Sequence, residues 1–244
     1  MKLTLNQTAV QAMGLWESLI FFGIPTLMLY TATHWAVPAL NRATKLPMIV
    51  SWFVCGGLLI FLPLSVAALV FYRLEGNPWH LTAFLDRFRL SSPSWRTLLW
   101  TVLGVLGIGI MTSGIVAAAP VVIPDFSPQP SFMSVTPLGE SDRWILFAWM
   151  PLFLFNILGE ALFWRGYIFP RQELAFGTHT WLVHGLCWWM FHIPLGMSLL
   201  VILTPIIFIT SFVVQRTKST WSDIIIHTLI NGLGFLLVAF GVVH

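Results

Sequence analysis

A carboxylate and a guanidinium interrupt the apolar run Asn156-Ile157-Leu158-Gly159-Glu160-Ala161-Leu162-Phe163-Trp164-Arg165-Gly166-Tyr167. An ionisable side chain at the centre of a bilayer costs about 2.5 to 3.5 kcal/mol even on lenient insertion scales, so it usually faces a polar cavity or a partner. Glu160 and Arg165 could instead lie near the end of a span and extend their charged groups to the interface. Further polar positions downstream in apolar segments, at His192, His227 and Asn231, favour a buried site.

The composition indicates the class of protein. Of the 244 residues, 57% are hydrophobic and 9% are charged, whereas a soluble domain carries about 25% charged residues. The apolar runs suit α-helices of about 20 residues, and the alternating pattern of a membrane barrel is missing from the sequence. We therefore expect an all-α polytopic membrane helix bundle, with residues 1–244 forming a single integral membrane domain surrounded by lipid.

The apolar runs predict about seven transmembrane helices. The expected spans are Leu15–Val37, Pro47–Tyr72, Trp95–Val122, Arg143–Pro170, Thr178–Pro194, Ser198–Val214 and Trp221–Val243. Residues Leu81–Leu90 have the pattern of a short amphipathic helix on the membrane surface. Residues Pro120–Pro137 are rich in Pro and Ser, which is typical of an extended loop.

The basic residues outside the spans are divided unequally between the two faces. One face has eight (Lys2, Arg73, Arg87, Arg89, Arg96, Arg171, Arg216 and Lys218), and the other has three (Arg42, Lys45 and Arg143). Because cytoplasmic loops carry an excess of Lys and Arg, this split predicts an internal N-terminus. It also predicts a site entrance near Arg171 and Trp221 on the cytoplasmic side. These charges lie at span ends, and the net charge is only +3, so we expect no nucleic-acid partner.

The polar positions suggest hydrolytic chemistry. His227 and Asn231 are four residues apart and so share one helix face, and Glu160 lies at a comparable depth from the same membrane side. Trp188 and His192 show the same spacing on the fifth span. A carboxylate can take a proton from water, while imidazole and amide donors stabilise the oxyanion that develops. Each histidine could also serve only as an interhelical hydrogen-bonding residue.

Three segments together carry a resemblance to a known family. Glu160–Arg171 resembles the first motif of the CPBP family of intramembrane proteases (the CAAX protease and bacteriocin-processing family), usually written EExxxR. Trp188–Pro194 is similar to its FxxxH motif, with Trp188 at the aromatic position, and His227–Asn231 is similar to its HxxxN motif. The family-like core covers about residues 144–235, and the first three spans add nothing specific.

The resemblance implies an intramembrane glutamate or metallo-endopeptidase, a hydrolase of the cell membrane that cleaves a membrane-associated or prenylated peptide. It implies catalytic roles for Glu160 and His192, which activate water, and for His227 and Asn231, which hold the oxyanion. Arg165 and Trp188 would support the site. The implied location is the plasma membrane of a bacterium.

Ala161 departs from the family pattern, which usually has a second glutamate at this position. A glutamate there would lie one helical turn from Arg165, so Arg165 must find another partner. Glu160 is a poor one, because residues five apart lie about 140° apart around an α-helix. We therefore expect Glu173 or Asp223 to pair with Arg165.

These residues are compatible with a mechanism with or without a metal, and with functions other than proteolysis. Glu160, His192 and His227 could bind a divalent metal such as zinc with an open fourth position, but the same residues suffice for a mechanism without metal. A first alternative to the protease is a catalytically weakened relative that acts as a bacteriocin-immunity or peptide-binding membrane protein, which Ala161 favours. A second is a small transporter with a proton relay of buried Glu and His, although the inverted repeats of transporters are not evident in the sequence.

Overall fold

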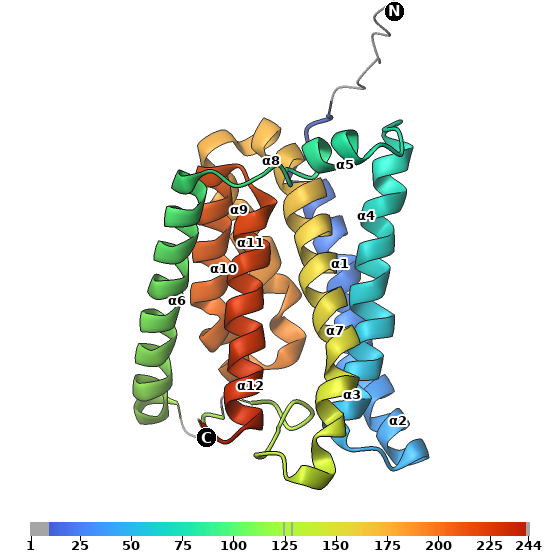
Figure 1. Cartoon of the computed structure of the whole chain (residues 1–244), viewed down its shortest axis with the longest axis vertical. Helices are drawn as coiled ribbons and strands as arrows, with labels where there is room; N and C mark the ends of the chain where they lie inside the picture. The colour runs from blue at the N-terminus through green and yellow to red at the C-terminus, as the bar shows by residue number, and fades with distance from the viewer. Residues whose placement is uncertain (1–9, 124, 128, 243–244) are drawn as a thin grey trace, which may run out of the picture.

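The computed structural model describes residues 10–123, 125–127 and 129–242. These residues form helices and no strand, which confirms the prediction of an all-α bundle. Figure 1 shows the long helices side by side along one axis, with α1 starting at one end and α12 finishing at the other. Two residues used in the predictions, Lys2 and Val243, lie outside the described residues.

Six helical runs in the described part of the chain are long and apolar enough to cross a membrane. They are Leu15–Thr44, Met48–Leu74, Trp95–Val122, Glu140–Phe191, Met197–Thr217 and Thr220–Ala239. The 52-residue run Glu140–Phe191 turns back at Gly177, which has a φ of +54° that favours glycine. The predicted count of seven is therefore only approximately met, because the helix after this turn has 12 residues.

The first half of the bundle contains two bent helices, a surface helix and one long straight helix. In chain order these are α1 (Leu15–Thr31), the π-helical η1 (Ala32–Ala36), α2 (Val37–Thr44), α3 (Met48–Gly56), the π-helical η2 (Gly57–Phe61), α4 (Leu62–Leu74), α5 (Leu81–Arg87) and α6 (Trp95–Val122). The predicted short helix is present as α5, and its position on the membrane surface stays a prediction. Ser94 caps α6, since its side chain accepts a hydrogen bond from the Thr97 backbone N–H at 3.2 Å.

The second half contains the family-like core. Its elements are η3 (Glu140–Asp142), α7 (Trp144–Glu160), the π-helical η4 (Ala161–Ile168), α8 (Phe169–Phe176), η5 (Gly177–His179), α9 (Thr180–Phe191), η6 (Ile193–Leu195), α10 (Met197–Thr217), α11 (Thr220–His227), the π-helical η7 (Thr228–Gly232) and α12 (Leu233–Ala239). As predicted, Pro194 lies at the end of the fifth span, where η6 replaces the α-helix.

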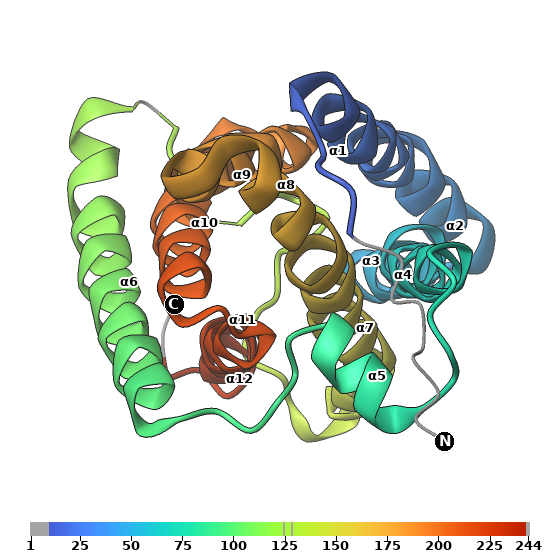
Figure 2. The same ribbon diagram turned by 90° about the horizontal axis from the view of Figure 1, so that it is seen from above.

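Packing places this core in the middle of the molecule. In Figure 2, α1 to α4 lie on one side and α6 on the other, with α7, α9, α10 and α11 between them. Helix α10 packs against both α6 and α9, and α7 packs against α3 and α4. We call the two ends of the bundle the α5/α8 end and the α2/η3 end, after the elements at each in Figure 1.

A close approach of backbones holds α7 against η2. A Cβ added to Gly159 would lie 2.5 Å from the carbonyl oxygen of Phe61 and 2.9 Å from Oγ of Ser65. Only glycine permits this separation. Because Glu160 is the next residue, the contact fixes the depth and the direction of its side chain.

Candidate functional site

The predicted catalytic residues lie at the points where three helices end. Glu160 is the last residue of α7, and the π-helical η4 follows it directly. His227 is the last residue of α11, and Asn231 lies in the π-helical η7 that follows. His192 immediately follows α9. Local changes from α- to π-helix commonly mark functional sites, because they redirect side chains from the regular α-helical positions.

Glu160 is buried, with 2% of the residue's surface exposed. Asn156 Nδ2 donates a hydrogen bond to Oε1 at 2.7 Å, and Trp188 Nε1 donates one to Oε2 at 2.7 Å. Each oxygen therefore has one donor and retains a second lone pair for another partner.

Trp188 connects the two histidines, Glu160 and Arg165. Its ring makes edge contacts with His192 and His227, at centroid distances of 5.4 and 5.3 Å. The guanidinium carbon of Arg165 lies 3.7 Å from the centre of the same ring, which is a close cation–π contact. The indole N–H of Trp188 meanwhile points at Glu160. Trp188 thus positions four charged or polar groups around one rigid ring.

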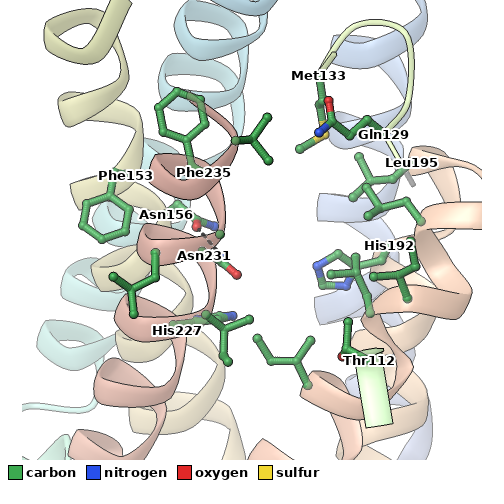
Figure 3. A pocket seen from close by; sticks show the side chains of 18 of the residues that line it. Thr112, Gln129, Met133, Phe153, Asn156, His192, Leu195, His227, Asn231 and Phe235 are labelled. Carbon is green, nitrogen blue, oxygen red and sulfur yellow. Dashed lines mark hydrogen bonds between the residues drawn. The ribbon is translucent and has the colours of Figure 1, made fainter. Parts of the chain in front are cut away.

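The tautomer of His192 follows from its hydrogen bond. Nδ1 lies 2.8 Å from the carbonyl oxygen of Trp188, and a carbonyl can only accept. Nδ1 therefore carries the proton, which leaves a lone pair on Nε2. Figure 3 shows the His192 ring beside the cavity, across from His227 and Asn231.

On the cavity wall opposite His192, Asn156 and Asn231 are linked by a hydrogen bond between their side-chain amides. Asn231 Nδ2 donates to Asn156 Oδ1 at 3.3 Å, and Asn156 in turn donates to Glu160. Figure 3 shows the link between the two asparagines. The sequence patterns did not predict a role for Asn156. One feature of the sequence could have indicated it: Asn156 is a polar residue in an apolar helix, four residues before Glu160 and hence on the same helix face.

Arg165 pairs with Asp223, one of its two expected partners. Arg165 Nε lies 3.2 Å from Asp223 Oδ1, and both side chains are completely buried. The expectation of Glu173 is wrong, because Glu173 pairs with Arg89 at 2.7 Å and Lys218 at 2.6 Å near the α5/α8 end. Glu173 and its two partners are all partly exposed, whereas Arg165 is completely buried.

Arg165 also begins a series of buried hydrogen bonds that leads to α1. Arg165 Nη1 donates to His184 Nε2 at 3.0 Å, so His184 Nδ1 carries a proton and donates to Gln172 Oε1 at 2.6 Å. Gln172 Nε2 donates to Ser18 Oγ at 2.9 Å, which connects α8 to α1. His184 thus serves as an interhelical hydrogen-bonding residue.

One cavity of about 960 Å³ contacts all of the predicted catalytic residues. Its wall includes Glu160, Trp188, His192, His227 and Asn231. The remainder is mostly apolar and comes from α3, α6, α7, α10 and α12. The structure therefore brings together the residues that were selected from three separate motifs.

The cavity extends in the direction opposite to the one expected. It reaches Gln129, Met133 and other residues of the loop at the α2/η3 end, as Figure 3 shows. The predicted entrance near Arg171 and Trp221 is wrong for this cavity, because neither residue lines it. Their polar groups are used in packing: Arg171 bonds to Glu75 at 2.9 Å, and Trp221 Nε1 donates to the Leu90 carbonyl at 2.8 Å.

The expected metal ligands do not form a metal centre in the described part of the chain. No group of three or more His, Cys, Asp or Glu side chains there could hold a metal ion. Asn156 and Trp188 hold the two Glu160 oxygens by hydrogen bonds, so the carboxylate is engaged by the protein itself. The described residues as they stand therefore do not form a metal centre.

Fold and site together define an integral membrane protein with a buried glutamate, two histidines and an asparagine on one cavity. Residues 142–233 match the family model described as Type II CAAX prenyl endopeptidase Rce1-like. The match includes every predicted site residue and confirms the resemblance to the CPBP family. It spans less than half of the chain. Neither the curated proteins nor the solved structures gave a match.

Proposed function

We propose that this protein is an intramembrane endopeptidase of the CAAX-protease type, which cleaves a membrane-associated or prenylated peptide with water activated by Glu160 and His192. The observation that carries the proposal is the buried Glu160 carboxylate, held by two donors on the wall of a cavity that also contacts His192, His227 and Asn231. The family match supports protease activity at the level of the family.

The proposed reaction uses these groups in sequence. A water donates one hydrogen bond to His192 Nε2 and another to Glu160. As the water oxygen bonds to the scissile carbonyl carbon, Glu160 takes its proton, and the carbonyl π electrons move to oxygen. N–H groups of His227 and Asn231 stabilise that oxyanion. The oxyanion then re-forms the carbonyl, the C–N bond breaks, and Glu160 returns the proton to the leaving amine.

The shape and lining of the cavity support a lipidated substrate. The site residues Glu160, His192, His227 and Asn231 line one part of the cavity, while α6, α10 and α12 contribute Ile, Leu and Val side chains to the wall. A volume of about 960 Å³ lies at the upper end of the range for ligand pockets. An apolar chain would occupy the apolar part of the cavity and leave the attached peptide beside Glu160.

Cleavage of matched peptides by the purified protein in detergent tests the proposal. A fluorogenic peptide with a prenylated cysteine and the same peptide without the lipid are incubated with wild type and with Glu160→Gln. We expect cleavage of the prenylated peptide by wild type only. Parallel samples with a chelator and with added zinc separate a metal-dependent reaction from a metal-independent one. Equal cleavage by Glu160→Gln would rule out Glu160 as the base.

A second candidate function, binding of a peptide without cleavage, is favoured by one observation. Ala161 replaces the glutamate that the family motif usually has, so part of the catalytic machinery differs. For this alternative, wild type and Glu160→Gln bind the prenylated peptide equally and neither releases product. Binding by fluorescence anisotropy, recorded on the same samples, separates the two functions.

We propose further that the protein lies in a bacterial plasma membrane with the α5/α8 end in the cytoplasm. Arg73, Arg87, Arg96 and Arg216 lie in terminal turns of α4, α5, α6 and α10, and these turns are at the α5/α8 end. This supports the orientation by the positive-inside rule. The cavity then extends toward the outer side. Cysteine introduced at Lys218, which has 55% of its side chain exposed, should resist an impermeant thiol reagent in intact cells. Labelling from outside would reverse the orientation.

A further inference from the structure

Asp223 lies in the interior of the bundle, close to two positively charged or ionisable groups. Its carboxylate is completely buried, with Oδ1 at 3.2 Å from Arg165 Nε and Oδ2 at 3.8 Å from His227 Nδ1. Neither oxygen has a hydrogen-bond donor in the described part of the chain, so both contacts are electrostatic. A buried carboxylate in this state is costly, which makes a purely structural role poorly matched to its position.

The buried positive charge of Arg165 needs a carboxylate partner to offset the cost of its burial. It is completely buried, and its other polar contact is the neutral acceptor nitrogen of His184. In the family motif a glutamate stands at the position of Ala161, four residues before Arg165. In this chain Ala161 is buried and apolar, and the negative charge comes from α11 instead. The charge balance of the site is thus kept although the motif is broken.

The position of Arg165 is transmitted to Glu160 through Trp188. The guanidinium covers the indole ring at 3.7 Å, and the same indole donates its N–H to Glu160 at 2.7 Å. A shift of Arg165 would therefore remove one of the contacts that position the indole N–H beside Glu160. Asp223 also faces His227, on the oxyanion side of the cavity. One carboxylate therefore acts on both sides of the proposed reaction centre.

We propose that Asp223 is a positioning residue that supplies, from α11, the negative charge that the family motif supplies at the position of Ala161. The proposal rests on the proposed peptidase function for its effect on rate, but its electrostatic part is independent of that function. It follows that Ala161 does not mark a disabled enzyme, since the guanidinium has a carboxylate partner from another helix.

A double-mutant cycle between positions 161 and 223 tests the electrostatic part. Thermal unfolding in detergent is measured for wild type, Ala161→Glu, Asp223→Ala and the double variant. Ala161→Glu should lower Tm in the wild-type background, because it adds a second buried carboxylate beside one guanidinium. It should raise Tm in the Asp223→Ala background, because it restores the missing charge. Ala161→Gln is the matched neutral control and should not raise Tm in either background.

The catalytic part is tested on the same proteins with the prenylated peptide. Asp223→Ala and the near-isosteric Asp223→Asn should each reduce kcat about 10²-fold, as misplaced catalytic groups do, with a smaller change in KM. Ala161→Glu should restore most of the lost kcat in the Asp223→Ala background, and Ala161→Gln should not. Glu173→Gln, which removes an acid paired elsewhere, serves as the control for charge loss and should keep wild-type kcat.

The outcomes separate the two proposals. An effect of Ala161→Glu on Tm that is the same in both backgrounds would overturn the assignment of Asp223, whatever the activity. Reversal of the Tm effect in a protein that never cleaves peptide would support the charge replacement and refute the peptidase function. Full kcat in Asp223→Asn would overturn the positioning role while leaving the peptidase function in place.

Discussion

At the scale of single residues, the site is organised by hydrogen bonds and stacking around Glu160 and Trp188. Three motifs far apart in the sequence predicted the residues that share the cavity, because each motif reports a polar group in an apolar helix. The partners of those groups were harder to predict. Asp223 and Glu173 were equivalent by position, and only the structure shows that Asp223 alone reaches Arg165. The role of Asn156 depends on the rotation of α7 against η7.

The indole N–H of Trp188 gives the first prediction. Trp188→Phe keeps most of the ring but removes the donor at 2.7 Å from Glu160. Leaving a buried acceptor without this donor should lower the free energy of unfolding by about 1–3 kcal/mol. It should also reduce kcat about 10²-fold, because the carboxylate loses its orientation. Peptide cleavage and thermal unfolding of the purified variant measure both effects.

The neighbouring residue provides the matched control. Trp189 also uses its indole N–H in a hydrogen bond, to Thr204 Oγ1 at 3.2 Å, but this bond lies away from Glu160. Trp189→Phe should therefore change kcat little. Equal loss of kcat in the two variants would show that the Trp188 hydrogen bond has no special part in the reaction.

At the scale of elements, π-helical segments and close helix contacts set the directions of the site residues. The apolar pattern predicted most span ends closely, since length and hydropathy are local properties. The first helical run continues past Val37 to Thr44, however, and the fourth past Pro170 to Phe176. It did not predict η4 or η7, because a π-helical segment has no comparable pattern in the sequence and depends on the packing around it. These segments begin immediately after Glu160 and His227, which is why the geometry of the site could not be derived from regular α-helical spacing.

Gly159 gives the prediction for the packing of α7. In Gly159→Ala the new Cβ meets the Phe61 carbonyl oxygen at 2.5 Å, so α7 and η2 must separate. Overpacking of this kind costs about 1–3 kcal/mol, and the shift displaces Glu160. We expect a lower Tm and a lower kcat. For Gly23→Ala on α1, where no atom lies within 4 Å of the added Cβ, we expect an unchanged or raised Tm, and a matching fall in that control would contradict the packing argument.

The ionic cluster at the α5/α8 end gives a prediction about pH. Glu75 accepts hydrogen bonds from Arg87 Nε at 2.6 Å and Arg171 Nη1 at 2.9 Å, which fastens α5 and α8 to the end of α4. Burial raises the pKa of Glu75, but the hydrogen bonds and charges of Arg87 and Arg171 lower it by more. The net pKa therefore lies below the ordinary value of 4.5.

A lowered pKa in the folded protein means that Glu75 stabilises the fold above pH 4.5, and that this contribution is lost as the pH falls through the folded pKa. The Tm of the wild-type protein should therefore fall as the pH is lowered below 4.5. Glu75→Gln should have a lower Tm at pH 7 and a weaker dependence on pH below 4.5. Glu140→Gln, at the opposite end of the bundle, is the control. A wild-type profile in Glu75→Gln would contradict the assignment.

At the scale of the whole molecule, the cavity lies between α6 and the family-like core. Composition predicted a membrane bundle, and the motifs predicted a shared site, but neither indicated the direction in which the cavity extends. That direction depends on how α6 diverges. Gly104 packs against Val213 and Ile226, whereas a Cβ on Gly109 or Gly114 would meet no atom within 4 Å. The half of α6 nearer the α2/η3 end lines the cavity, with Gly109, Thr112 and Val116 among the lining residues, and no local sequence signal specifies the tilt of a helix.

This divergence makes Gly109 and Gly114 a matched pair for the last prediction. Both lie on α6 with open space around them, but only Gly109 lines the cavity. A tryptophan at position 109 would fill part of the cavity between α6 and α10, where we expect the apolar chain of the substrate. Gly109→Trp should therefore raise KM for the prenylated peptide about tenfold or more, since an apolar chain gains about 0.8 kcal/mol per buried CH₂. Gly114→Trp should retain the wild-type KM.

Cleavage kinetics with the prenylated and the unmodified peptide measure the difference between the two variants. The peptide without lipid should show little change in either variant. If Gly109→Trp leaves KM for the prenylated peptide unchanged, the lipid occupies another part of the bundle, and the apolar half of the cavity has no part in substrate binding.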